Sequence, residues 1–151
     1  KQGSLNGMSF SENNWERKQV SIGWKMYMNS SQAFVALQNL KKLDRKKLRL
    51  ADVRACYNEH FDLSNTSDHL YRINIYNRSH VMNKLKAVNI TTGIHYNPLH
   101  LMELYKDGSS LGKSEYDGAT TLSIPFHENL TDGEINYIVN EIKKYASFST
   151  L

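Results

Sequence analysis

The sequence contains little cysteine, little proline and no long apolar run. One cysteine and two prolines occur in 151 residues, and a single cysteine excludes an internal disulfide and a cysteine-only metal cage. No apolar run reaches the ~18 residues of a membrane-spanning helix. Lys1–Leu5 forms no apolar signal region and does not begin with Met. We therefore expect a cytoplasmic protein with no membrane segment, and a processed, tagged or truncated product.

Short catalytic signatures are also missing. There is no Gly-x-Gly-x-x-Gly run, phosphate-binding loop, His-Glu-x-x-His pair, EF-hand or Gly-x-Ser-x-Gly elbow. His95 and His100 lie across a proline turn, but only Glu103 adds a nearby carboxylate, so we expect no metal site. Cys56 lies in a helical pattern without a neighbouring base, which favours an inert core thiol over a nucleophile.

The chain does have an ordinary globular composition and a positive net charge. Hydrophobic residues make up 40% and charged residues 23% of it, which fits one folded domain. The net charge is +4, and much of the excess lies between Lys41 and Arg54. This run is either the solvated face of a helix or a nucleic-acid surface. Because aromatic residues do not interleave with it, we expect no nucleic-acid partner. A bound sugar-nucleotide diphosphate would also account for the charge.

Apolar periodicity predicts helices mixed with short strands, after a polar lead-in segment over residues 1–22. The predicted helices span 29–40, 43–60, 77–88, 99–105, 113–119 and 131–142, and the predicted strands span 70–76, 90–95 and 122–124. Thr131–Glu134 is a capping box that predicts the start of the last helix. This order indicates an α+β fold in which helices pack on a small, mostly antiparallel sheet.

The most unusual local string is Gly93–His100, which places two imidazoles and a phenol around a turn at the end of a predicted strand. Turns on a rigid scaffold often carry function. These groups suit hydrogen bonds to sugar hydroxyls or phosphate, or proton transfer. A structured turn with surface histidines fits the sequence equally well, so the residues alone leave both interpretations open.

Three separated motifs resemble the DegT/DnrJ/EryC1/StrS sugar aminotransferases. Gly23–Ala33 and Gln38–Asp44 resemble that family's Gly-Tyr-Asn-x-Arg-Met-(Ser/Thr)-x-x-Gln-Ala-Ala and Gln-Leu-x-x-Leu-Asp runs. His95–His100 is similar to its His-Tyr-Pro-Pro-Leu-His string, and Ser123–Ile135 to its Leu-Pro-Leu-His and Leu-Thr-Asp-Glu-Glu-Ile ending. The three motifs occur in the family's order over nearly the whole chain, which makes the resemblance specific.

The resemblance implies that residues 23–151 form the C-terminal small domain of a fold type I pyridoxal-phosphate transferase. Members of this family move an amino group, usually from glutamate, to a nucleotide-linked keto-sugar, and they are dimers with sites at the subunit interface. Their Schiff-base lysine stands in a Ser-Phe-x-x-x-Lys context, which none of the 13 lysines here matches. We therefore expect the large pyridoxal-phosphate-binding domain and all catalytic residues to be absent from this chain, and the chain to be inactive alone.

The resemblance also implies which residues bind cofactor and substrate. Lys25 stands where the family has an asparagine that reaches the cofactor phosphate of the neighbouring subunit, and a lysine also binds phosphate. The substrate-binding residues expected from the motifs are His95, Tyr96, His100, Trp24 and Tyr27.

Two departures from the family pattern leave other functions open. Tyr27 replaces an arginine and loses a bidentate phosphate or carboxylate contact, and Phe34 replaces a small alanine. A non-catalytic binding or dimerisation module with the same fold is one alternative. A member of the family that dehydrates its sugar is another.

Overall fold

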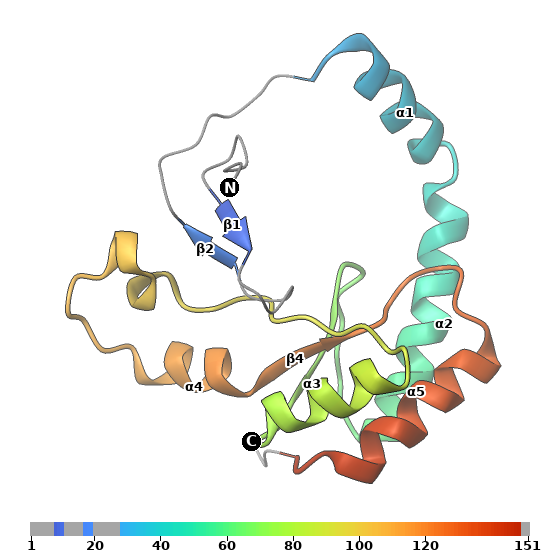
Figure 1. Ribbon diagram of the computed structural model, residues 1–151. Coiled ribbons are helices and arrows are strands. Elements are labelled where there is room, and N and C mark those ends of the chain that lie inside the picture. The colour runs from blue at the N-terminus through green and yellow to red at the C-terminus, as the bar shows by residue number, and fades with distance from the viewer. Residues whose placement is uncertain (1–7, 11–16, 20–27, 149–151) are drawn as a thin grey trace.

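The computed structural model describes residues 8–10, 17–19 and 28–148, with side chains from Met28 onward. The helices are α1 (Ser30–Leu40), α2 (Leu43–Phe61), α3 (Arg78–Ala87), α4 (Gly112–Thr120) and α5 (Asp132–Tyr145), with the short 3-10 turns η1 (Leu99–Leu101) and η2 (Glu103–Tyr105). The strands are β1 (Met8–Phe10), β2 (Arg17–Gln19), β3 (Tyr71–Asn74) and β4 (Thr121–Ile124). This arrangement, shown in Figure 1, confirms the predicted α+β fold class.

β3 and β4 form the antiparallel sheet at the centre of the fold, although they are far apart in the sequence. Tyr71 lies opposite Ile124 at one end of the pair. Just past the end of β3, Ile75 forms an isolated bridge with Phe148 near the end of the described chain. The sheet therefore joins segments from the middle and the end of the sequence.

The predicted strand at 90–95 is wrong, because only Gly93 pairs with the sheet. Its backbone N–H donates to the Ser123 carbonyl at 3.0 Å, and the Ser123 N–H donates back at 2.8 Å. β4 has four residues and is followed by Pro125, which has no N–H to extend a ladder. A glycine in the middle also weakens a strand.

One face of the sheet packs against α2, α3 and α5. Along β3, Tyr71 and Ile73 are buried whereas Arg72 is exposed, as expected for a strand with one covered face. The predicted apolar stripe of α5 is buried too. Burial of each such side chain stabilises the fold by about 1.5–3 kcal/mol. The buried apolar residues are Val53, Tyr57, Tyr71, Ile73, Ile75, Val81, Met82, Leu85, Ile90, Leu122, Ile124, Leu130, Ile135, Ile138, Val139 and Ile142.

Capping boxes begin the first and last helices. The Asn29 side chain accepts from the Gln32 N–H at 2.9 Å, and Gln32 accepts from the Asn29 N–H at 3.0 Å. Thr131 and Glu134 make the same reciprocal contacts at the start of α5, as predicted. These bonds satisfy backbone donors that a helix leaves free in its first turn.

The lead-in segment, for which the sequence predicted no helix or strand, contains two short strands. Residues 8–10 and 17–19 form the antiparallel pair β1–β2, with Met8 opposite Gln19 and Phe10 opposite Arg17. Strands of three residues are too short for alternation to be distinct, so periodicity could not predict them. The rest of residues 1–22 lies outside the described part of the chain.

α1 is left exposed by the part of the chain that the structure describes. None of its residues is buried. Figure 1 shows α1 at the far end of α2, away from the sheet and α5. Its apolar residues Phe34, Val35, Leu37 and Leu40 are 50–63% exposed. Since an isolated helix of this length is marginal in water, its apolar side is a surface suited to packing against another part of a larger structure.

Candidate functional site

The turn predicted to carry function starts at the Gly93 bridge and ends in η1. A Cβ atom placed on Gly93 would lie 2.6 Å from His95 Cε1, so glycine is needed for the imidazole to lie against the backbone. The His95 and Tyr96 rings meet edge to face with centroids 5.0 Å apart, across a cis peptide bond. Tyr96 is 63% exposed, and its ring is therefore accessible to a ligand.

α4 holds the second half of this turn. A Cβ atom on Gly118 would lie 2.4 Å from Pro98 Cδ, so the helix and the proline ring are in direct contact. His100 is buried, and its Nε2 lies 3.1 Å from Oε1 of Glu115 on α4. Glu115 also accepts from the Leu111 N–H at 2.7 Å. The pKa of this carboxyl group is lowered mainly by the hydrogen bond from the Leu111 N–H, and to a smaller extent by the one with His100.

The structure thus brings three of the predicted site residues, His95, Tyr96 and His100, into one turn. Tyr96 is exposed, whereas His100 is engaged with Glu115. The other predicted residues, Trp24, Lys25 and Tyr27, lie outside the described residues. Their roles stay predictions.

His95 shares one face of the sheet with residues that the sequence did not single out. Residues directly opposite each other in a ladder point to the same face. Gly93 lies opposite Ser123, which lies opposite Arg72. Because a Cβ on Gly93 would strike the His95 ring, the imidazole is on this face as well. Asn74 and its partner Thr121 continue it. We call this side of the sheet, formed by Arg72, Asn74, Thr121, Ser123 and His95, the polar face, although Thr121 and Ser123 themselves are buried.

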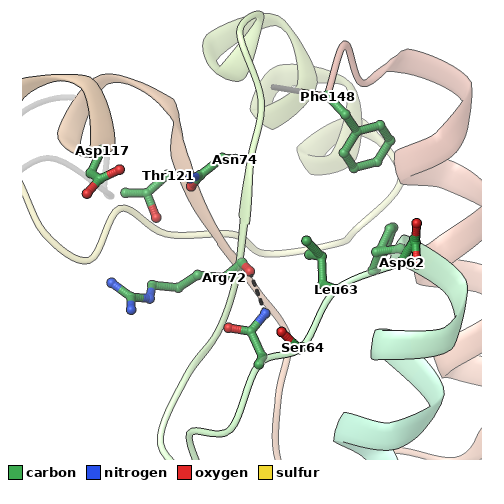
Figure 2. Close-up of a pocket in the computed structure, with 10 residues that line it drawn as sticks. Asp62, Leu63, Ser64, Arg72, Asn74, Asp117, Thr121 and Phe148 are labelled. Atoms are coloured by element: carbon green, nitrogen blue, oxygen red, sulfur yellow. Dashed lines mark hydrogen bonds between the residues drawn. The ribbon is translucent and has the colours of Figure 1, made fainter. Parts of the chain in front are cut away.

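A pocket of about 600 Å³ opens beside β3, next to the polar-face residues Arg72, Asn74 and Thr121. It is lined by Phe61, Asp62, Leu63, Ser64, Asn65, Arg72, Asn74, Asp117, Thr121 and Phe148. Figure 2 shows the Arg72 guanidinium extending from β3 into the pocket on the same side as Asp117 and Thr121. Leu63 and Phe148 lie on the other side of the strand in this view. One side of the pocket therefore has charges of both signs, and on the other side the apolar Leu63 and Phe148 lie near the Asp62 carboxylate.

Hydrogen bonds fix the loop that forms one wall of the pocket. The Asn65 N–H donates to Asn58 Oδ1, and Asn58 Nδ2 donates to the Asn65 carbonyl, both at 3.1 Å. Asn65 Nδ2 then donates to the Arg72 carbonyl at 2.9 Å. This network ties α2 to β3 through the loop, so the wall is held in place without a ligand.

Sequence reasoning missed the pocket because its members are distant in the sequence. Asp117 and Arg72 belong to different elements and only the β3–β4 pairing brings them together. One signal was available: Arg72 and Asn74 occupy the polar positions of an alternating strand, which is where a sheet places side chains on its uncovered face.

Other chemistries are not supported by the described residues. No group of three or more His, Cys, Asp or Glu side chains between residues 28 and 148 is arranged to hold a metal. Cys56 packs against the core, and burial raises the pKa of its thiol, which disfavours the reactive thiolate. The helices described by the structure include none with the length and apolar character of a membrane span.

Comparison with known proteins gives a consistent assignment. A sequence model of the DegT/DnrJ/EryC1/StrS aminotransferase family matches residues 2–143. The chain is 29% identical to the uncharacterized protein MJ1066 of Methanocaldococcus jannaschii, over 91% of this chain and 42% of that protein. It is 26% identical to the spore coat polysaccharide biosynthesis protein SpsC of Bacillus subtilis, over 93% of this chain and 44% of SpsC. The chain thus spans less than half the length of these relatives.

The fold comparison agrees with the sequence comparison. A DegT DnrJ EryC1 StrS aminotransferase from Brucella abortus superposes with a TM-score of 0.71 at 26% identity, over 84% of this chain and 38% of that structure.

The described residues alone do not form a site for the pyridoxal phosphate expected from the sequence. A Schiff-base lysine has to lie in a pocket beside the cofactor, yet no lysine lines the pocket described above. All described lysines are exposed except Lys46, which is half-buried and ion-paired with Glu128 at 2.6 Å. Residues outside the described part would have to hold the cofactor.

Proposed function

Because this chain belongs to the DegT/DnrJ/EryC1/StrS aminotransferase family, we propose that it is the C-terminal small domain of a nucleotide-sugar aminotransferase. The observation that supports this most strongly is the family match over residues 2–143 combined with coverage of only 42–44% of two relatives. The polysaccharide biosynthesis role in the name of SpsC supports a sugar substrate. Under this proposal residues 23–151 are the small domain, and a large domain completes a dimeric, cytoplasmic enzyme.

In the proposed enzyme this chain binds and orients the substrate. Tyr96 offers an exposed phenol to the keto-sugar nucleotide, and His95 lies beside it on the polar face. His100, held by Glu115, fixes the turn that presents them. Lys25 would contact the cofactor phosphate of the neighbouring subunit, with Trp24 and Tyr27 shaping the interface.

Pyridoxal phosphate would supply the electron sink for amino transfer, usually from glutamate, once it is bound to a Schiff-base lysine. No catalytic group of that chemistry is assigned to this chain. Its contribution is orientation of the substrate and exclusion of water from the domain boundary.

Reconstitution with a complementary large domain tests the proposal. The 151-residue chain is combined with the N-terminal portion of a relative, the portion that contains the Schiff-base lysine. We expect an imine absorbance on addition of pyridoxal phosphate and amino transfer from glutamate to a nucleotide-linked keto-sugar. A well-folded complex that shows neither would contradict the proposal, and dehydration of the sugar would assign the chain to the dehydrating members of the family.

Variants of the turn separate a substrate role from a structural one. In the reconstituted enzyme, Tyr96→Phe should raise KM for the sugar nucleotide while the imine absorbance stays unchanged. Tyr105→Phe is the matched control, since Tyr105 is also about half exposed but lies in η2. Equal KM values for the two variants would remove Tyr96 from the substrate site.

A non-catalytic binding or dimerisation module is the second candidate. The uncovered apolar side of α1, which includes the departure from the family pattern at Phe34, favours it. Titration with a nucleotide-sugar distinguishes the candidates: a complex that assembles but binds no nucleotide-sugar supports the module.

A further inference from the structure

The pocket on the polar face combines charges of both signs with an apolar wall. Figure 2 shows Arg72 and Asp117 on one side of β3, and Leu63, Phe148 and the Asp62 carboxylate on the other. Its volume of about 600 Å³ lies within the range of small-molecule sites. A ligand with a charged head and an apolar tail can contact Arg72 and Asp117 on one side and Leu63 and Phe148 on the other.

The charged groups of this pocket are not paired with each other. Among residues 28–148, the Arg72 guanidinium makes no ion pair or hydrogen bond, and no ion pair joins it to Asp117. The Asp117 carboxylate contacts Lys113 at 3.9 Å, and the Lys113 side chain is 86% exposed. An exposed pair at this distance is weak, so Asp117 stays available to a ligand cation.

The balance of charge selects the class of ligand. Asp62 adds a second carboxylate to the lining, which repels a phosphate or diphosphate. A guanidinium binds a carboxylate through two parallel N–H donors, and a carboxylate binds an ammonium group. The Asn74 amide and the Thr121 hydroxyl supply neutral hydrogen-bonding groups on the same side. These groups fit a zwitterion better than a polyanion.

We infer that this pocket binds a free α-amino acid with an apolar side chain. Arg72 takes the carboxylate, Asp117 takes the ammonium group, and the side chain lies against Leu63 and Phe148. The wall formed by Asn65 is already fixed by Asn58 and by the Arg72 carbonyl, so binding requires little ordering of the loop. This inference needs no pyridoxal phosphate and stands apart from the proposed aminotransferase function.

Calorimetric titration of the 151-residue chain with L-leucine tests this assignment. We expect saturable binding that Arg72→Gln and Asp117→Asn each weaken by at least ~10-fold, since each removes one charge-assisted contact. The matched controls are Arg45→Gln and Asp52→Asn, whose residues are exposed on α2 and form no described ion pair. Both controls should bind like the unchanged chain.

Ligand analogues test the zwitterion directly. 4-Methylpentanoate lacks the ammonium group and 3-methylbutylamine lacks the carboxylate, and each should bind at least ~10-fold more weakly than L-leucine. Absence of L-leucine binding, equal binding of 4-methylpentanoate, or tighter binding of inorganic phosphate would overturn the inference. If Arg72→Gln does not fold, Arg72→Lys keeps the charge but loses the planar fork and should show intermediate affinity. Unchanged affinity in the folded variants would also overturn it.

Discussion

Gly118 determines how closely α4 approaches the turn at Pro98. Gly118→Ala would place a methyl group 2.4 Å from Pro98 Cδ, which forces the helix and the proline ring apart. We expect a loss of about 1–3 kcal/mol in the free energy of unfolding, as for other overpacked sites. Urea denaturation monitored by circular dichroism measures it.

Gly133→Ala is the matched control for this change. Gly133 also lies in a helix, but nothing is within 4 Å of its added Cβ. Alanine there should leave stability unchanged or raise it by up to about 1 kcal/mol. Equal losses in both variants would mean that the contact with Pro98 is not tight in solution.

His100 ties the same turn to α4 through Glu115. Its side chain is only 8% exposed, and its partner oxygen is 3.1 Å away. His100→Ala should lower the free energy of unfolding by about 1–3 kcal/mol, because it leaves the site without this hydrogen bond and its packing. Thermal unfolding measures the loss. His127→Ala, at an exposed position on the segment after β4, should change it by less than about 0.5 kcal/mol.

At this scale the sequence predicted the turn better than the pocket. The resemblance pointed to His95, Tyr96 and His100, and the structure places all three in one turn. It could not predict that His100 is buried against Glu115, because that contact depends on how α4 packs. Arg72 and Asp117 had no local pattern of their own, since only the strand register brings them to one pocket.

Among the elements, α5 depends on its capping box. The Thr131 hydroxyl accepts from the Glu134 N–H at 3.2 Å. Thr131→Ala should cost about 0.5–2 kcal/mol in the free energy of unfolding, measured by urea denaturation. Thr66→Ala, in an exposed loop, is the control. No difference between the two variants would show that the cap does not stabilise the domain.

Glu134 makes this cap sensitive to pH. Hydrogen bonds lower the pKa of Glu134 below its ordinary value of 4.5. The largest effect comes from the backbone N–H of Thr131 and the next from the Thr131 hydroxyl. The folded pKa is thus below the unfolded one, so the stabilisation is present above about pH 4.5 and is lost as pH falls through the folded value. Glu134→Gln should reduce the loss of stability between about pH 5 and about pH 3, measured by urea midpoints. An unchanged pH profile would argue against the contact.

Most helices were predicted well because they bury one apolar stripe or begin with a recognisable cap. The helix predicted over 99–105 is wrong, since the segment forms the two short 3-10 turns η1 and η2. The strands were predicted less well for reasons of length. β4 has four residues and β1 and β2 have three each, too few for alternation to be distinct. The segment at 90–95 alternates but has only Gly93 within reach of a partner strand.

At the scale of the whole molecule, the exposed apolar side of α1 predicts that the chain associates with a complementary domain through this helix. Replacing both Phe34 and Leu37 with Glu should leave the unfolding free energy of the chain nearly unchanged, because neither side chain is buried. The same change should abolish association with the complementary domain, measured by size-exclusion chromatography with light scattering. Replacing Gln38 and Asn39 with Glu is the control, since both are polar residues of the same helix. Full association of the Phe34 and Leu37 variant would exclude α1 as the docking surface.

The pairing of β3 with β4 also governs how the chain reaches its fold. Arg72 and Ser123 are neighbours in the sheet, but α3, the turn and α4 lie between them in the sequence. Closing a loop of that length has an entropic penalty that later contacts must offset, and such non-local pairing slows folding. Helices α2 and α5 can gain structure earlier from local contacts, whereas the polar face and its pocket come into existence with the sheet. A ligand at this pocket would therefore stabilise the native state but not the folding transition state. It would slow unfolding more than it speeds folding.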